Sequence, residues 1–213
     1  MKPTIIALLL LTTYTCFGQS RKSALSDIRN KYQLIRELLD SNALRQHHTD
    51  YSCKETSEEG TLTFYYNSSE LKHISHNYTK GHVNYRDEFY IWDDELFFQY
   101  SIHNIWYKDY ERNKSGKLEK VDVTLTLEER FYFENNAIIK CQFKDYENRS
   151  NTPKIIKTQH IRNKNVGCDQ AQDALEKFNT LLQYQEINIK DACNLPRSIT
   201  KTEIIDIINN SRN

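Results

Sequence analysis

The histidines and acidic residues could support acid–base or metal chemistry, but their spacing argues against both. His73 and His76 lie three residues apart in a segment that is typical of a β-strand, so alternation sends the two rings to opposite faces. The run Asp93-Asp94-Glu95 is explained by turn chemistry. The sequence contains no HExxH, no GxSxG and no phosphate-binding glycine loop. We therefore expect no enzyme, cofactor or metal site; a hydrolase built from His103 and nearby acids is the weakest alternative.

The cysteines indicate an oxidising compartment. If the N-terminal leader described below is removed, Cys53, Cys141, Cys168 and Cys193 are left, and an even number in an exported chain favours two disulfides. Because Cys168 and Cys193 bracket a predicted helix, we favour Cys168–Cys193 together with Cys53–Cys141. The alternative is that the thiols are free and buried as small apolar side chains. No CxxC pair is present, so a zinc site is not expected.

The N-terminus has the pattern of a secretory signal peptide over residues 1–18. Lys2 precedes a short apolar run, and cleavage after Gly18 would place small residues at the required positions. A buried N-terminal helix and lipidation of Cys16 are the alternatives. No later segment reaches transmembrane length, so after cleavage we expect one domain, residues 19–213, in the periplasm or outside the cell.

Helical periodicity marks both ends of this domain. In the segment 19–45, apolar residues recur at steps of three and four from Leu25 to Leu39, and Ser23 is a suitable N-cap. In the C-terminal part, 168–210, Asp169 would cap a second amphipathic helix that carries Phe178. A capping box at Thr200–Glu203 predicts a short terminal helix.

Alternation between apolar and polar residues predicts an antiparallel meander of six strands over residues 60–147. Residues 46–60 are a polar stretch that leads into the strands, and 109–120 is expected to be the longest loop of the sheet. Strand 121–127 has one polar side. The predicted fold class is α+β: a meander sheet packed with an N-terminal helix and one or two C-terminal helices.

Three segments that read aromatic, turn, aliphatic are predicted to be β-hairpins with three-residue loops, at 67–69, 92–94 and 134–136. These loops set the pairs that we expect across the sheet, which are Leu62 with Ile74, Phe89 with Phe97, Phe131 with Ile139, and Leu127 with Phe143. A two-residue turn at Lys80-Gly81 would pair Tyr78 with Val83 and His76 with Tyr85. A two-residue loop in the last hairpin would place Phe131 opposite Lys140 and break the apolar face.

The hairpins resemble those of a group of uncharacterised exported proteins of Bacteroidota, whose repeats read roughly Tyr-Tyr-Asp-Asn-Gly-Glu-Leu, and are more distantly similar to MORN repeats. The resemblance covers residues 60–145 and the leader, and the usual turn glycine is replaced in all three copies. It implies an envelope location and brings no activity and no functional residues.

The central hairpin is apolar on both faces, which is the strongest functional signal in the sequence. The second face is a candidate binding face made of Tyr90, Leu96, Phe98, Tyr100 and Ile102. Exposed aromatic patches bind partners, whereas helices covering both faces would make the same residues core. The first reading predicts a non-enzymatic binding module for a protein or glycan. The alternative is a carrier of a small apolar ligand between sheet and helix. Acidic and basic residues balance at 29 each, which argues against nucleic acid as the partner.

Overall fold

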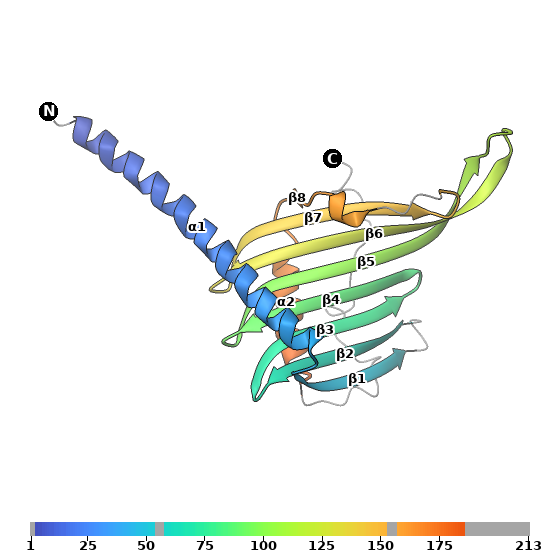
Figure 1. Cartoon of the computed structure of the whole chain (residues 1–213), viewed down its shortest axis with the longest axis horizontal. Helices are drawn as coiled ribbons and strands as arrows, with labels where there is room; N and C mark the ends of the chain where they lie inside the picture. The colour runs from blue at the N-terminus through green and yellow to red at the C-terminus, as the bar shows by residue number, and fades with distance from the viewer. Residues whose placement is uncertain (1–2, 54–57, 153–156, 186–213) are drawn as a thin grey trace.

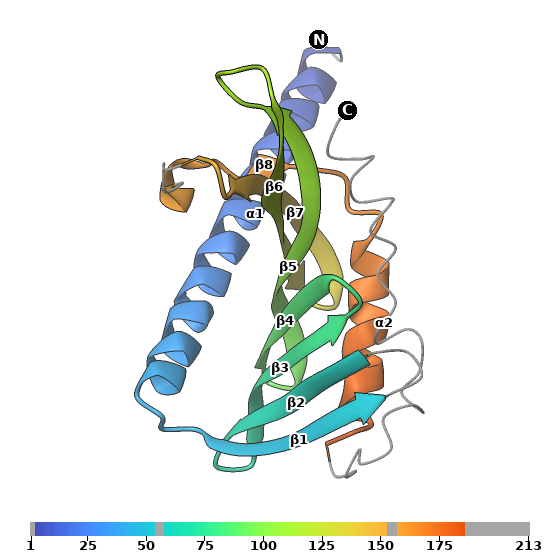
Figure 2. The same cartoon turned by 90° about the vertical axis from the view of Figure 1, so that its right-hand side faces the viewer.

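A single antiparallel sheet lies between two helices in the computed structural model, which describes residues 3–53, 58–152 and 157–185, with side chains from residue 22 onward. Eight strands follow one another in chain order: β1 (Arg45–Cys53), β2 (Glu58–Asn67), β3 (Glu70–Lys80), β4 (Val83–Trp92), β5 (Glu95–Arg112), β6 (Leu118–Glu134), β7 (Ala137–Arg149) and β8 (Lys164–Asn165). Helices α1 (Pro3–Asp40) and α2 (Ala171–Leu182) cover opposite faces (Figure 1, Figure 2). A 3-10 turn, Thr158–His160, precedes β8.

The α+β class and the antiparallel meander are confirmed, but the sheet has eight strands where six were predicted. Residues 45–53 of the polar stretch form β1, an edge strand whose inner side chains Thr49, Tyr51 and Cys53 are buried while most of the others are exposed. The predicted loop at 109–120 is mostly strand. It narrows to a turn at 113–117, where the Asn113 side chain accepts hydrogen bonds from the backbone N–H groups of Ser115 and Lys117, both at 3.0 Å.

Helix α1 runs through both the predicted leader and the predicted first helix, so Ser23 lies inside it and does not begin it. Its N-terminal half projects beyond the sheet (Figure 1). It ends at Asp40, earlier than expected, because Asn42 adopts a left-handed conformation with φ of 54° and the Ala43 N–H bonds back to the Leu38 carbonyl. Among the described residues, no helix is long and apolar enough to cross a membrane.

The three aromatic hairpins close with two-residue turns, not the predicted three-residue loops. The turns are 68–69, 93–94 and 135–136. Both turn residues have positive φ in the second and third hairpins, at 51° and 61° for Asp93 and Asp94 and 50° and 58° for Asn135 and Asn136. Two consecutive left-handed residues are typical of the type I′ turn, which matches the twist of a hairpin. Asp and Asn tolerate this conformation without the glycine of the resembling repeats.

A β-bulge follows each of these turns, and together they change the predicted register. Leu62 faces His76, Phe89 faces Gln99, Phe131 faces Cys141, and Leu127 faces Asp145. The turn between β3 and β4 uses Gly81-His82, so Tyr78 pairs with Tyr85 and His76 with Asp87. Every pair slips by two residues. In the three aromatic hairpins, a turn shortened by one residue is combined with one bulged residue. Between β3 and β4 there is no bulge, and a two-residue turn placed one residue later produces the same slip. A shift of two residues does not change the face on which a side chain lies. Side chains outside the bulges therefore remain on their predicted faces.

The bulged residues themselves change the face assignment. They are Lys72, Phe97 and Ile139, the extra residues at the three register shifts. Each bulge sends two consecutive side chains toward α1: Phe97 and Ile139 pack in the cluster around Ile28 and Ile35, and the Lys72 ammonium lies 4.4 Å from the centre of the Trp92 ring. The bulges therefore widen the surface of the sheet on which α1 packs. We call the side of the sheet that carries Tyr90 the α1 face, and the opposite side the α2 face.

Helix α2 packs on the α2 face through Ala171, Ala174, Phe178 and Leu181, all buried in the larger core. It follows Gln170, and no side chain caps it, so the predicted cap Asp169 lies outside the helix. A disulfide joins Cys141 of β7 to Cys168 just before α2. This bond contradicts the favoured Cys168–Cys193 and Cys53–Cys141 pairing. The terminal helix predicted after residue 200, and Cys193, lie outside the described residues.

Candidate functional site

The α2 face holds a polar network beneath α2. Lys177 of α2 donates a hydrogen bond to the Asp87 carboxylate of β4, and its ammonium lies 4.7 Å from the centre of the Tyr78 ring. The His103 Nε2 of β5 is 3.7 Å from the other oxygen of Asp87. Burial alone would raise the pKa of Asp87, but the Lys177 ammonium and the His103 ring hold that pKa below its ordinary value. The carboxylate is therefore charged and paired inside the core.

A second branch of the network crosses three strands. The Tyr51 hydroxyl of β1 lies 2.8 Å from the His76 Nε2 of β3, and the ring passes over Gly60 of β2. A β-carbon on Gly60 would lie 2.8 Å from the Tyr51 ring, so glycine is required at this crossing. Burial, and then the Lys177 charge, lower the pKa of His76, which leaves the ring neutral. The His76 ring stacks on Tyr78 with centroids 4.4 Å apart.

This network brings together the residues of the hydrolase alternative, since His103 does lie beside an acid. However, His76, Asp87, His103 and Lys177 are all buried. Burial also raises the pKa of the neighbouring Glu129. A substrate would have to displace α2 to reach these groups. The geometry is that of a polar core that fixes α2 on the sheet.

The α1 face is different, because α1 covers one band of it and leaves the rest open. Beyond α1, two rows of polar side chains run across the strands and enclose a trough of about 510 Å³. In one row, Asp50, Thr61, Asn77 and Arg86 are register neighbours from β1 to β4. In the other row, Glu59, Thr79, Asn84 and Asn104 are neighbours from β2 to β5. The backbone between the rows, at Tyr51, Gly60, Tyr78 and Tyr85, forms the floor.

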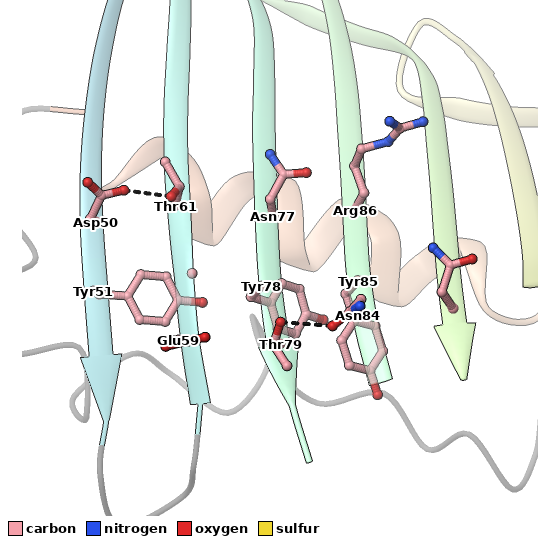
Figure 3. A pocket seen from close by; sticks show the side chains of 12 residues that line it. Asp50, Tyr51, Glu59, Thr61, Asn77, Tyr78, Thr79, Asn84, Tyr85 and Arg86 are labelled. Carbon is pink, nitrogen blue, oxygen red and sulfur yellow. Dashed lines mark hydrogen bonds between the residues drawn. The ribbon is translucent and has the colours of Figure 1, made fainter. Parts of the chain in front are cut away.

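Figure 3 shows this trough with α2 passing behind the strands. The Thr61 hydroxyl donates to the Asp50 carboxylate at 2.6 Å, and the Thr79 hydroxyl donates to the side-chain amide oxygen of Asn84 at 2.9 Å. These cross-strand bonds orient the wall side chains. Two carboxylates and one guanidinium line the trough, so its formal charge is −1. Its carboxamides and hydroxyls can both donate and accept hydrogen bonds.

A smaller apolar groove of about 320 Å³ lies where α1 meets the sheet. Ile28 and Tyr32 of α1 line one side, and Phe98, Tyr100 and Tyr132 line the other, with Arg29 and Arg130 also contributing. The Tyr32 and Phe98 rings meet edge to face at 5.4 Å.

A charged cluster closes the groove on the sheet side. The Glu128 carboxylate accepts hydrogen bonds from Arg130 at 2.5 Å and from the Tyr100 hydroxyl at 2.8 Å, and it pairs with Lys144 at 2.9 Å. Burial opposes ionisation of Glu128, but the donors Lys144, Arg130 and Tyr100 hold its pKa below the ordinary value. The groove therefore has aromatic walls and a satisfied polar end.

The structure divides the predicted binding face. Tyr90 and Phe98 are buried under α1, at 0% and 7% exposure, and Tyr100 and Ile102 are half-buried on the same side. Leu96 lies in the core of the α2 face, because the bulge at Phe97 separates it from the others. The prediction of an exposed aromatic face is therefore wrong for Tyr90, Leu96 and Phe98, and α1 is the reason. His73 and His76 do point to opposite faces, as predicted.

The trough residues were not singled out from the sequence. Asp50, Thr61, Asn77 and Asn84 look like ordinary polar positions of strands, and β1 was not predicted at all. One signal was available: Thr49, Tyr51 and Cys53 alternate with polar residues in the stretch that forms β1. What aligns the polar residues of different strands is the register, which lies two residues from the predicted one.

Among the residues that the structure describes, no three histidine, cysteine or acidic side chains are grouped to hold a metal ion. Comparison of the chain with protein-family models, with curated proteins and with solved structures finds no match.

Proposed function

We propose that this chain is an exported, non-enzymatic binding module that recognises a polyhydroxylated ligand, such as a saccharide, in the trough of the α1 face. The observation that carries the proposal is the pair of polar rows across five strands around a hollow of about 510 Å³. Carboxamides, carboxylates and hydroxyls that donate and accept at fixed spacing suit the vicinal hydroxyls of a sugar. The lining has one more carboxylate than cations, which does not suit a phosphate.

Three observations support export. The first eighteen residues have the charge and apolar pattern of a leader. The backbone of residues 3–18 belongs to the part of α1 that projects beyond the sheet (Figure 1). The Cys141–Cys168 disulfide fits an oxidising compartment. The resemblance of the hairpins to exported proteins of Bacteroidota points to the envelope.

The proposal is tested by screening the purified chain on a glycan array and titrating the best saccharide against variants. The double variant Asn77→Ala/Asn84→Ala removes exposed wall groups, each of which contributes about 0.5–1.5 kcal/mol through its hydrogen bonds. Affinity should fall by roughly 10- to 100-fold. The matched control Asn148→Ala/Asn179→Ala changes two exposed asparagines outside the trough and should bind normally. Failure to retain any saccharide, or equal binding by all variants, would overturn the proposal.

A second candidate function is a carrier of a small apolar ligand, which the groove beside α1 favours. The groove has aromatic walls, as apolar ligand sites do. Its volume of about 320 Å³ is at the lower end of the range for small-molecule sites. Native mass spectrometry of the purified chain should then show a copurified small molecule that is lost in Ile28→Trp, where the larger side chain fills the groove. A mass equal to that of the protein alone would argue against a carrier.

A further inference from the structure

The hairpin formed by β5 and β6 extends past the neighbouring strands as an arm (Figure 1). We define the arm as residues 106–112 of β5, 118–124 of β6 and the turn between them. Its strands stay paired throughout, from Trp106 opposite Thr124 to Arg112 opposite Leu118. The arm carries three of the large apolar side chains that are most exposed in the described part of the chain: Trp106 at 52%, Tyr110 at 62% and Leu118 at 52%.

The two sides of the arm differ in charge. On the inner side, Arg149 of β7 pairs with Asp109 at 2.9 Å and also with Glu111, and its other terminal nitrogen lies 3.1 Å from Glu147. Val121 and Val123 are buried on that side. The inner side is therefore an acidic surface that Arg149 fastens to the sheet. This clamp gives the arm a defined orientation.

The outer side of the arm is aromatic and basic. Strand alternation places Trp106, Lys108, Tyr110 and Arg112 together, and their register partners are Thr124, Asp122, Lys120 and Leu118. Three cations (Lys108, Arg112 and Lys120) thus share this side with the single carboxylate Asp122, which pairs with Lys108. The turn adds two exposed cations, Lys114 and Lys117. Positive charge is concentrated here although the whole chain is neutral.

We propose that the outer side of the arm docks on an anionic membrane surface. Tryptophan and tyrosine favour the region between lipid headgroups and acyl chains, where an amphipathic ring has one apolar and one wet end. Arginine and lysine extend apolar stems while their charged ends reach anionic headgroups. The exposed rings, Leu118 and surplus cations of the arm match both requirements on one rigid side. This surface is separate from the trough and does not depend on the saccharide proposal.

Vesicle binding with an internal reporter tests this proposal. The chain has two tryptophans, so Trp92→Phe leaves Trp106 as the only indole. With vesicles of phosphatidylcholine and phosphatidylglycerol, Trp106 fluorescence should shift to the blue and be quenched by brominated acyl chains. Binding should weaken as salt is raised and should be far weaker with phosphatidylcholine alone. Because the signal comes from the arm itself, membrane association through α1 would not produce it.

Charge variants locate the surface. Lys108→Gln/Arg112→Gln/Lys120→Gln should lower partitioning by on the order of 100-fold, since each cation near an anionic surface contributes about a factor of five. The matched control Lys22→Gln/Lys157→Gln/Arg162→Gln removes three exposed cations elsewhere. It should partition onto the vesicles like the protein without charge substitutions. Circular dichroism confirms that each variant is folded. Absence of quenching, equal binding to neutral vesicles, or equal loss in both triple variants would overturn the proposal; so would capture of an acidic protein without any vesicle binding.

Discussion

The two faces of the sheet contain similar residue types but use them in different ways. On the α2 face, charged groups are buried and paired, as in Lys177 with Asp87, and α2 covers them. On the α1 face, a buried aromatic band under α1 adjoins polar rows that stay open to solvent. Burial makes the polar groups of the first face part of the core, where each must have a partner. On the second face the polar groups of the trough stay open to solvent, where other molecules can reach them.

This difference teaches that a polar cluster is not by itself a site. The group of His103, Asp87 and Lys177 contains more side chains suited to acid–base chemistry than the trough does. It nevertheless serves to orient α2. The trough has ordinary side chains, but it has room and access. Substitutions on the two faces should therefore have different consequences, with large losses of stability on the α2 face and small ones on the open part of the α1 face.

The largest effect is expected for Lys177→Met. Removing the ammonium leaves Asp87 buried without its main partner, and breaking a buried ion pair in this way costs about 3–5 kcal/mol. Urea denaturation with the disulfides intact measures the loss. The double variant Lys177→Met/Asp87→Leu removes both charges and should recover most of the stability. If the double variant is as unstable as the single one, the pair does not stabilise the α2 face as described.

Gly60→Ala should lower the free energy of unfolding by about 1–3 kcal/mol, because the new methyl group would lie 2.6 Å from the Asn77 carbonyl oxygen and 2.8 Å from the Tyr51 ring. Replacing glycine in a strand would otherwise be favourable, so the sign of the effect is informative. Thermal unfolding compared with Gly167→Ala, where the nearest group is the Asp169 side chain at 3.2 Å, provides the control. A stabilised Gly60→Ala variant would mean that the ring does not cross β2 there.

His73 should make the protein less stable in acid. It packs between Tyr65 and Tyr90, neither ring nitrogen has a hydrogen-bond partner among the described residues, and burial, helped by Arg36, lowers its pKa to about 3. The unfolded chain takes up the proton near pH 6.5, so stability is complete above that pH and falls as the pH drops toward 3.

Between pH 7 and pH 5 this single residue should cost about 2 kcal/mol. His73→Phe keeps the ring packing and should remove that part of the pH dependence, measured as the difference between the unfolding free energies of the two proteins across the range. Parallel pH profiles for the two proteins would show that His73 titrates normally.

The smallest effect is expected for Asn77→Ala, on the open part of the α1 face. Its exposed side chain donates a hydrogen bond to the Ser75 hydroxyl at 2.9 Å, and surface changes of this kind alter stability by less than about 0.5 kcal/mol. Calorimetry of the purified variant measures the change. A loss comparable to that of Lys177→Met would erase the contrast between the faces.

Much of the fold could be predicted from local patterns. Alternation identified the meander, and steps of three and four identified the helical segments around Ile28 and Phe178. The turn lengths could not be predicted in the same way. A three-residue loop, and a two-residue turn followed by a bulge, both keep Phe131 on the same face, so face patterning alone does not distinguish them. The bulges then moved Leu96 and Phe97 to faces opposite those predicted.

The cysteine pairing and the first strand also required the tertiary structure. Cys141 and Cys168 meet because β8 pairs with β7 at Gln142 and Phe143, which brings the chain back beside Cys141, and the two α-carbons lie 5.5 Å apart. Cys53 is disulfide-bonded as well. Strand β1 has only one buried side and few strong strand formers, so its sequence resembles a loop until β2 pairs with it.

The sequence by itself determined the periods of its segments, because period depends on residues that are neighbours along the chain. It also specified a central hairpin that is apolar on both faces. Only the tertiary structure decided which surface was left open, since α1 crosses one band of that face and α2 seals the other. Coverage depends on contacts between segments that are far apart in the chain, and no local pattern records where a helix will lie.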